Sequence, residues 1–72
     1  MWHNNIKVKA TFAADGFKDV WANLDTLGWR RIKTDASQSV SNLYTLLSGA
    51  RAHDRTVNAH LDGSEIDIAY LK

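Results

Sequence analysis

The sequence predicts a small α+β domain, and three stretches carry this prediction. Residues 5–12 alternate between apolar and polar side chains, which is typical of a strand with one buried face. Residues 39–52 have the apolar spacing of an amphipathic helix, and residues 55–72 resemble a β-hairpin. A chain of 72 residues buries a thin core, so we expect one domain spanning residues 1–72.

The first stretch predicts a strand with a basic outer face. The side chains expected to face the core are Ile6, Val8, Ala10 and Phe12. Lys7 and Lys9 would then point outward. Residues 1–4 are expected to form a loose end, with Trp2 docked on the domain, and residues 14–17 are expected to form a turn.

Residues 18–25 have two interpretations. A helix beginning at Asp15 and ending at Gly28 would have an apolar face of Phe17, Val20, Trp21, Leu24 and Leu27. A strand would instead follow a three-residue loop, with Phe12 opposite Val20, Ala10 opposite Ala22, Val8 opposite Leu24 and Lys7 opposite Asp25. Periodicity alone favours neither. Residues 25–28 are expected to form the next turn, and residues 28–34 predict a short strand.

The predicted helix begins after a polar loop, with Ser37 or Ser39 as its N-cap. Its apolar face consists of Val40, Leu43, Leu47 and Ala50, flanked by Tyr44 and Leu46. Gly49 lies inside the helix, where we expect it to allow close packing on a sheet. Arg51 and His53 fall in the last turn, where cations suit the helix dipole.

Asp62 and Gly63 predict a two-residue type I′ turn for the hairpin that follows. The expected pairs are Leu61 with Ser64, Ala59 with Ile66, Val57 with Ile68, and Arg55 with Tyr70. The buried face would then consist of Val57, Ala59, Leu61, Ile66, Ile68 and Tyr70.

The second half resembles small OB-fold domains of the bacterial toxin B-subunit kind. The matching segments are residues 43–52, 56–61 and 66–71, and the step from Gly28 through Trp29 to Arg30 is similar to the step before the helix in such domains. The resemblance covers about two thirds of the chain. It implies a small OB-like, partly open five-stranded antiparallel barrel with one helix, in the order β-β-β-α-β-β, and it favours a strand at residues 18–25. The alternative is a βαβαββ two-layer sandwich.

The chain differs from those relatives in ways that argue against a glycan-binding role. It has no cysteine, no visible signal peptide and none of their longer sugar-binding loops. The absence of cysteine also excludes a disulfide or a Cys-based zinc site. No apolar run is long enough for a transmembrane helix, so we expect a cytoplasmic protein that is not in the membrane.

The net charge of +1 is too balanced for strong, sequence-independent polyanion binding. The charge is uneven, because residues 1–33 carry a net +3 and residues 34–72 a net −2. The most suggestive functional residues lie in the basic half. The candidate binding residues are Trp21, Trp29, Arg30 and Arg31, with Lys7 and Lys9 nearby in the strand interpretation.

No pattern of residues predicts catalysis, a cofactor or a metal site. His3, His53 and His60 are interpreted as solvent-facing, and Asp62, Glu65 and Asp67 as a solvated edge. The sequence therefore predicts a non-enzymatic binding or assembly module, a homo-oligomer or the ligand of a protein partner, that uses an exposed aromatic and basic strand face. The alternative is an OB-type protein that binds single-stranded nucleic acid.

Overall fold

The computed structural model describes residues 1–14, 16, 18–34 and 39–72. Within them the elements are β1 (Trp2–Ala14), β2 (Asp19–Leu24), β3 (Gly28–Arg31), α1 (Val40–Ala52), β4 (Thr56–Asp62) and β5 (Glu65–Leu71). The predicted order β-β-β-α-β-β is confirmed. The βαβαββ alternative is wrong, because the ambiguous segment forms β2 and pairs on both sides in the sheet.

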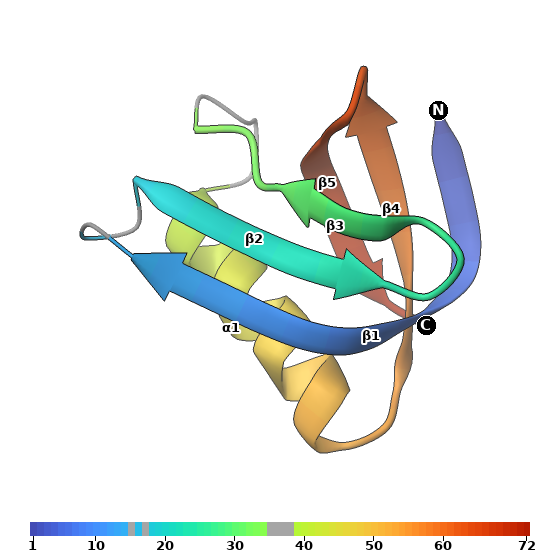
Figure 1. The fold of residues 1–72 in the computed structure, drawn as a ribbon. Coiled ribbons are helices and arrows are strands. Elements are labelled where there is room, and N and C mark those ends of the chain that lie inside the picture. The colour runs from blue at the N-terminus through green and yellow to red at the C-terminus, as the bar shows by residue number, and fades with distance from the viewer. Residues whose placement is uncertain (15, 17, 35–38) are drawn as a thin grey trace.

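The strands form one five-stranded antiparallel sheet in the order β3-β2-β1-β4-β5. The long strand β1 lies at its centre and bends, so that its first half pairs with β4 and its second half with β2 (Figure 1). The sheet is not closed into a barrel. Its two edges approach each other at a parallel bridge between Ile32 and Ile66, where the Lys33 N–H donates to the Ile66 carbonyl at 2.9 Å.

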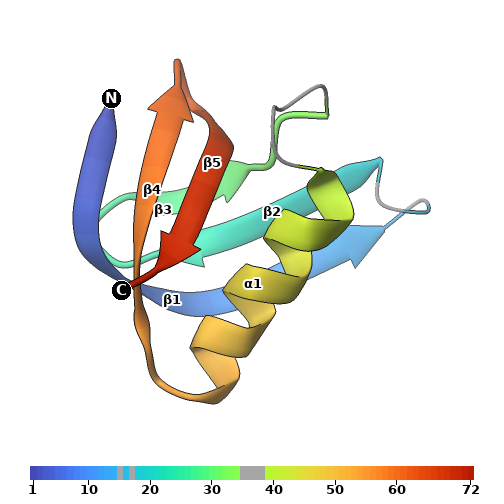
Figure 2. The ribbon, with the colours of Figure 1, turned by 180° about the vertical axis from the view of Figure 1, so that it is seen from behind.

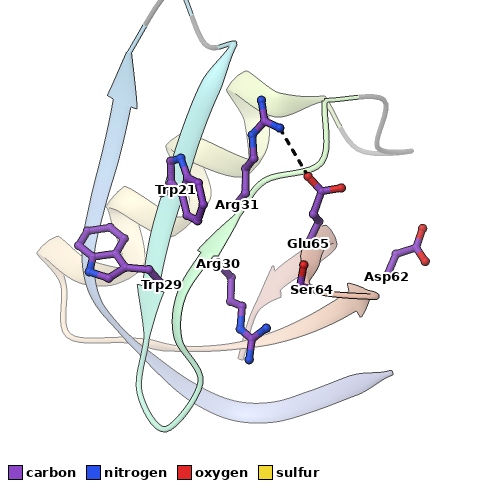
Figure 3. Close-up of a pocket in the computed structure, with 7 residues that line it drawn as sticks. All are labelled: Trp21, Trp29, Arg30, Arg31, Asp62, Ser64 and Glu65. Atoms are coloured by element: carbon purple, nitrogen blue, oxygen red, sulfur yellow. Dashed lines mark ion pairs between the residues drawn. The ribbon is translucent and has the colours of Figure 1, made fainter.

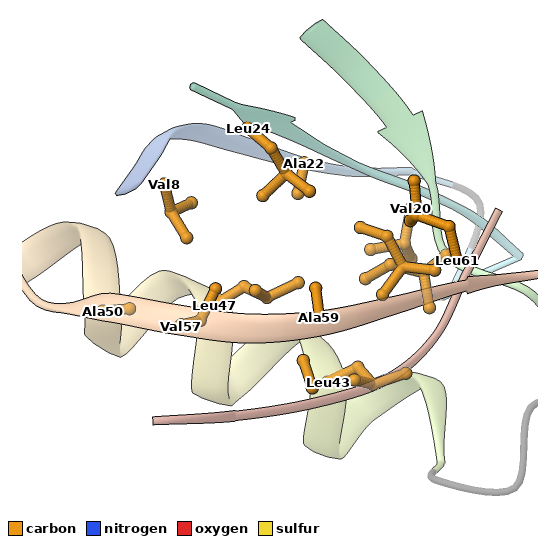
Figure 4. Close-up of a cluster of buried hydrophobic side chains, with 13 residues drawn as sticks. Val8, Val20, Ala22, Leu24, Leu43, Leu47, Ala50, Val57, Ala59 and Leu61 are labelled. Atoms are coloured by element: carbon orange, nitrogen blue, oxygen red, sulfur yellow. The ribbon is translucent and has the colours of Figure 1, made fainter. Parts of the chain in front are cut away.

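Helix α1 packs on the concave side of this bent sheet (Figure 2). Its N-cap is Ser39, whose hydroxyl accepts from the Asn42 N–H at 3.2 Å, whereas Ser37 lies outside the described residues. The predicted helix face is confirmed, since Leu43, Leu47 and Ala50 are fully buried. These side chains meet those of the strands in one core (Figure 4). The strand residues of that core are Val8, Val20, Ala22, Leu24, Ile32, Val57, Ala59, Leu61, Ile66 and Ala69.

The prediction for Gly49 is wrong. A β-carbon added at Gly49 would meet nothing within 4 Å, so close packing does not require glycine there. His53 lies just past the helix as its C-cap, while Arg51 is in the last turn as expected.

A β-bulge in β1 corrects the expected pairing with β2. Val8 pairs with Leu24 as predicted, but the register then shifts across Lys9. Phe12 therefore lies opposite Trp21 instead of Val20, and its side chain is 51% exposed instead of buried. One extra residue moves every later side chain of the strand to the other face of the sheet.

The C-terminal hairpin also differs from the prediction. Asp62 pairs with Glu65, so Gly63 and Ser64 form the turn, with a positive φ of 65° at Gly63. A bulge in β5 then places Ala69 in the core and leaves Tyr70 exposed. The expected opposition of Leu61 to Ser64 is replaced by a pair of Leu61 with Ile66. Ala59 lies opposite Ala69, and Val57 lies opposite Leu71.

The prediction of a loose end at residues 1–4 is wrong. Strand β1 begins at Trp2, which pairs with His60 of β4. The docking of Trp2 is confirmed, because its ring lies 5.3 Å from that of His60 and 5.6 Å from that of Tyr70. The predicted turn at residues 14–17 includes Asp15 and Phe17, which lie outside the described residues.

Candidate functional site

The face of the sheet away from α1 presents the predicted tryptophans. In β2, Val20, Ala22 and Leu24 are buried, so the intervening side chains point to the outer face. Trp21 pairs with Arg31 of β3, and Asn23 pairs with Trp29. The β1 bulge adds Phe12 beside Trp21. Three successive strands thus bring these aromatic side chains together.

We call Phe12, Trp21 and Trp29 the aromatic face. They line a shallow hollow of about 360 Å³ with an almost entirely apolar surface. Phe12 and Trp29 are each about half exposed, at 51% and 49%. Exposed aromatic side chains that adjoin one another in this way are typical of an interaction surface.

A second hollow, of about 250 Å³, adjoins the aromatic face at the outer edge of β3 (Figure 3). We call it the edge hollow. Its lining residues are Trp21, Trp29, Arg30, Arg31, Asp62, Ser64 and Glu65. The two hollows share both tryptophans, so they form one continuous surface.

Arg31 is held by polar groups on three sides. Its Nη2 donates to the Lys18 carbonyl at 3.0 Å, and its guanidinium lies 3.7 Å from Asp19 and 3.9 Å from Glu65. Asp19 also accepts from the Trp21 indole N–H at 2.6 Å. Arg31 Nε is buried without a hydrogen-bond partner among the described residues. Arg31 and Trp21 are therefore oriented through the same carboxylate.

Arg30 has a different environment from Arg31. The two side chains point in opposite directions from β3 (Figure 3). Arg30 Nε donates to the Leu27 carbonyl at 3.1 Å, which completes the turn between β2 and β3. Within the part of the chain that the structure describes, no carboxylate forms an ion pair with Arg30.

The acidic side of the edge hollow is already paired with cations. The hydrogen bond and the charge of Lys33 lower the pKa of the Asp62 carboxyl below its usual value of 3.8. Glu65 lies beside Arg31. Asp62 and Glu65 therefore each have a cation nearby.

Lys7 and Lys9 do not join this surface. Lys7 Nζ lies 3.1 Å from Asp54, and neither lysine lines either hollow. The Asp25 N–H donates to the Lys7 carbonyl at 2.9 Å, so these residues are neighbours as predicted. The Lys7 side chain nevertheless pairs with Asp54 instead of Asp25, because the chain after α1 brings that carboxylate close.

The structure therefore brings together four of the six predicted binding residues, namely Trp21, Trp29, Arg30 and Arg31. Sequence reasoning missed Phe12, which it assigned to the core, and it treated Asp62 and Glu65 as unrelated to the arginines. The parallel bridge between Ile32 and Ile66 places these acids beside the arginines. No pattern of neighbouring residues in the sequence predicts this contact between remote segments.

The described residues contain no cluster of three or more histidine, aspartate or glutamate side chains that could hold a metal ion. Among the same residues, no helix is both long and apolar enough to cross a membrane. No protein-family model matches the chain, and neither a curated protein nor a solved structure is significantly similar to it.

Proposed function

We propose that this chain is a non-enzymatic binding and assembly module that uses the aromatic face for self-association or for a protein partner. The aromatic face itself carries the proposal, because Phe12, Trp21 and Trp29 line one apolar hollow on the side of the sheet that α1 does not cover, and Phe12 and Trp29 are exposed there. Burying the exposed halves of Phe12 and Trp29 would remove substantial apolar surface from water.

The composition of the surface supports a protein ligand. Tryptophan and arginine are the residues most enriched at the energetic centres of protein interfaces. Here Trp21 and Trp29 lie beside Arg30 and Arg31. Association would also add stability to a domain of 72 residues, whose own core is thin.

We propose further that the module is OB-like, as a partly open barrel. The order β-β-β-α-β-β and the helix between β3 and β4 support this assignment. The bridge between Ile32 and Ile66 also supports it, because it brings the two edge strands together as barrel closure would require.

Single-stranded nucleic acid is the second candidate ligand, because bases stack on exposed tryptophans beside arginines. The balanced net charge of +1 disfavours it, since strong binding of several phosphates needs an excess of cations. Binding to oligothymidine that weakens steeply with rising salt would support this candidate instead.

Light scattering over a range of protein concentrations tests the assembly half of the proposal. We expect a wild-type mass above that of the monomer, and a shift toward monomer in Trp29→Ala. Trp2→Ala is a matched control, because Trp2 is 45% exposed but lies on the β1–β4 side of the sheet. A wild-type protein that stays monomeric at high concentration would leave only a partner protein, and equal effects of the two variants would contradict a specific role for the aromatic face.

A further inference from the structure

Strand β3 lies at one edge of the sheet. The Ile32 N–H donates to the Val20 carbonyl of β2 at 2.8 Å. In an antiparallel pair, alternate residues direct their N–H and C=O groups to the same side. The main-chain groups of Trp29 and Arg31 therefore point away from β2. Lys33, the next residue in this alternation, uses that side to reach Ile66 of β5.

The neighbouring strand takes up only the end of this edge, where the parallel bridge involves the main-chain groups of Arg31 and Lys33, and Trp29 lies beyond it. Strands β3 and β5 meet at the bridge between Ile32 and Ile66, and toward Gly28 the edge hollow separates β3 from the β4–β5 turn. One wall of the hollow comes from β3, and the other from Asp62, Ser64 and Glu65. A strand edge beside a hollow is a template for the addition of another extended chain.

Charge determines what such a chain should carry. Lys33 pairs with Asp62, and Arg31 lies beside Glu65, so the acids of the hollow are matched. Arg30 remains without an ion pair among the described residues, and its Nε is occupied by the Leu27 carbonyl. Its two terminal nitrogens are oriented as a fork that suits one carboxylate.

We propose that an extended acidic segment of a partner protein adds along the free edge of β3, with a carboxylate on Arg30 and an apolar side chain on the aromatic face. This inference rests on the proposed function and names the partner. Trp29 and Arg30 are adjacent in β3 and point to opposite faces. The acidic and apolar residues of the partner must therefore also point to opposite faces of its strand, as residues i and i+1 or residues i and i+3 do.

The edge favours a peptide over a nucleic acid for two reasons. A peptide strand supplies alternating N–H and C=O groups that match those of Trp29, and a nucleotide chain does not. A peptide also needs only one negative charge at Arg30, whereas a phosphate backbone brings several, and Arg30 is the one cation lining the edge hollow that forms no ion pair among the described residues.

Selection of displayed random nonapeptides against the wild-type protein tests the inference. We expect enriched peptides to carry an acidic residue beside an apolar one and to bind Arg30→Gln about tenfold more weakly. Arg51→Gln is a matched control, because Arg51 Nε also donates to a main-chain carbonyl, that of Lys9. On binding, the amide signal of Trp29 should shift and exchange more slowly with solvent.

A charge reversal gives a second test that does not depend on loss of binding. Selection against Arg30→Glu should enrich a basic residue in place of the acidic one. Circular dichroism of each variant would establish that it is folded.

Other outcomes would overturn the inference. Peptides without an acidic preference, or peptides that bind Arg30→Gln as tightly as wild type, would contradict it. If those peptides still required Trp29, the proposed function would stand and only the acidic edge partner would be wrong. If the selection enriched no peptide and the protein bound oligothymidine at low salt, the inference would be overturned in favour of the nucleic-acid candidate.

Discussion

The carboxylate of Asp67 lies 2.7 Å from Nδ1 of His60, across the bulge that interrupts the pairing of β4 with β5. Leu61 pairs with Ile66 and His60 pairs with Ile68, so Asp67 is the extra residue of the bulge. Both side chains are mostly buried, with 17% of Asp67 and 30% of His60 exposed. This contact attaches the unpaired residue of β5 to the neighbouring strand.

We expect Asp67→Ala to lower the free energy of unfolding by about 1–2 kcal/mol, because it removes a partly buried hydrogen bond to the bulge. Urea denaturation would measure the change. Lys7→Gln is the control, since the pair of Lys7 with Asp54 is exposed and should contribute about 0.5 kcal/mol or less. Equal effects of the two substitutions would mean that the bulge contact is no more stabilising than a surface ion pair.

The bulge in β1 predicts an unequal response to truncation of two large apolar side chains. Leu24→Ala should cost about 2–5 kcal/mol, because Leu24 is fully buried in the core. Phe12→Ala should cost about 1 kcal/mol or less, because Phe12 is on the open outer face. Chemical denaturation of both variants would measure these changes. A similar loss in both would place Phe12 in the core, as the uninterrupted register predicts.

Two glycines should respond to alanine with opposite signs. Gly49→Ala should raise the stability by about 1 kcal/mol, because a β-carbon meets nothing there and alanine favours a helix. Gly63→Ala should lower it by about 1–2 kcal/mol, because φ at Gly63 is 65°. The thermal midpoint of each variant, compared with that of the wild-type protein, measures the two effects. Destabilisation by Gly49→Ala would show that α1 needs glycine for a reason other than packing.

The ion pair of Lys33 with Asp62 predicts a dependence on pH. Lys33 lowers the pKa of the Asp62 carboxyl in the folded state below 3.8, so the pair stabilises the fold above that pH. This contribution should be lost as the pH falls through the lowered pKa, because the folded state then also binds the proton. Carboxyl NMR titration should show the low pKa in wild type and a return toward 3.8 in Lys33→Met. An unchanged pKa in that variant would contradict the role of Lys33.

The main differences between the predicted and observed structures come from the two bulges. Phe12 and Tyr70 were both assigned to the core by strict alternation, and both are about half exposed. A bulge leaves the local apolar pattern readable on either side but changes which face the later residues occupy. Its position is set by the pairing with the neighbouring strand, and β1 has one shift against β2, between Val8 and Ala10, and another against β4, between His3 and Ile6.

The amino-acid sequence by itself determined the features that depend on nearby residues. The helix is one of these, with a serine N-cap and with its buried Leu43 and Leu47, because helical hydrogen bonds and apolar spacing act within a few residues. The tertiary structure alone decided that Phe12 joins Trp21 and Trp29, and that the β4–β5 turn brings carboxylates beside the arginines of β3. Those contacts depend on how closely the two edges of the bent sheet approach each other, and the packing of the whole core sets the distance between these edges.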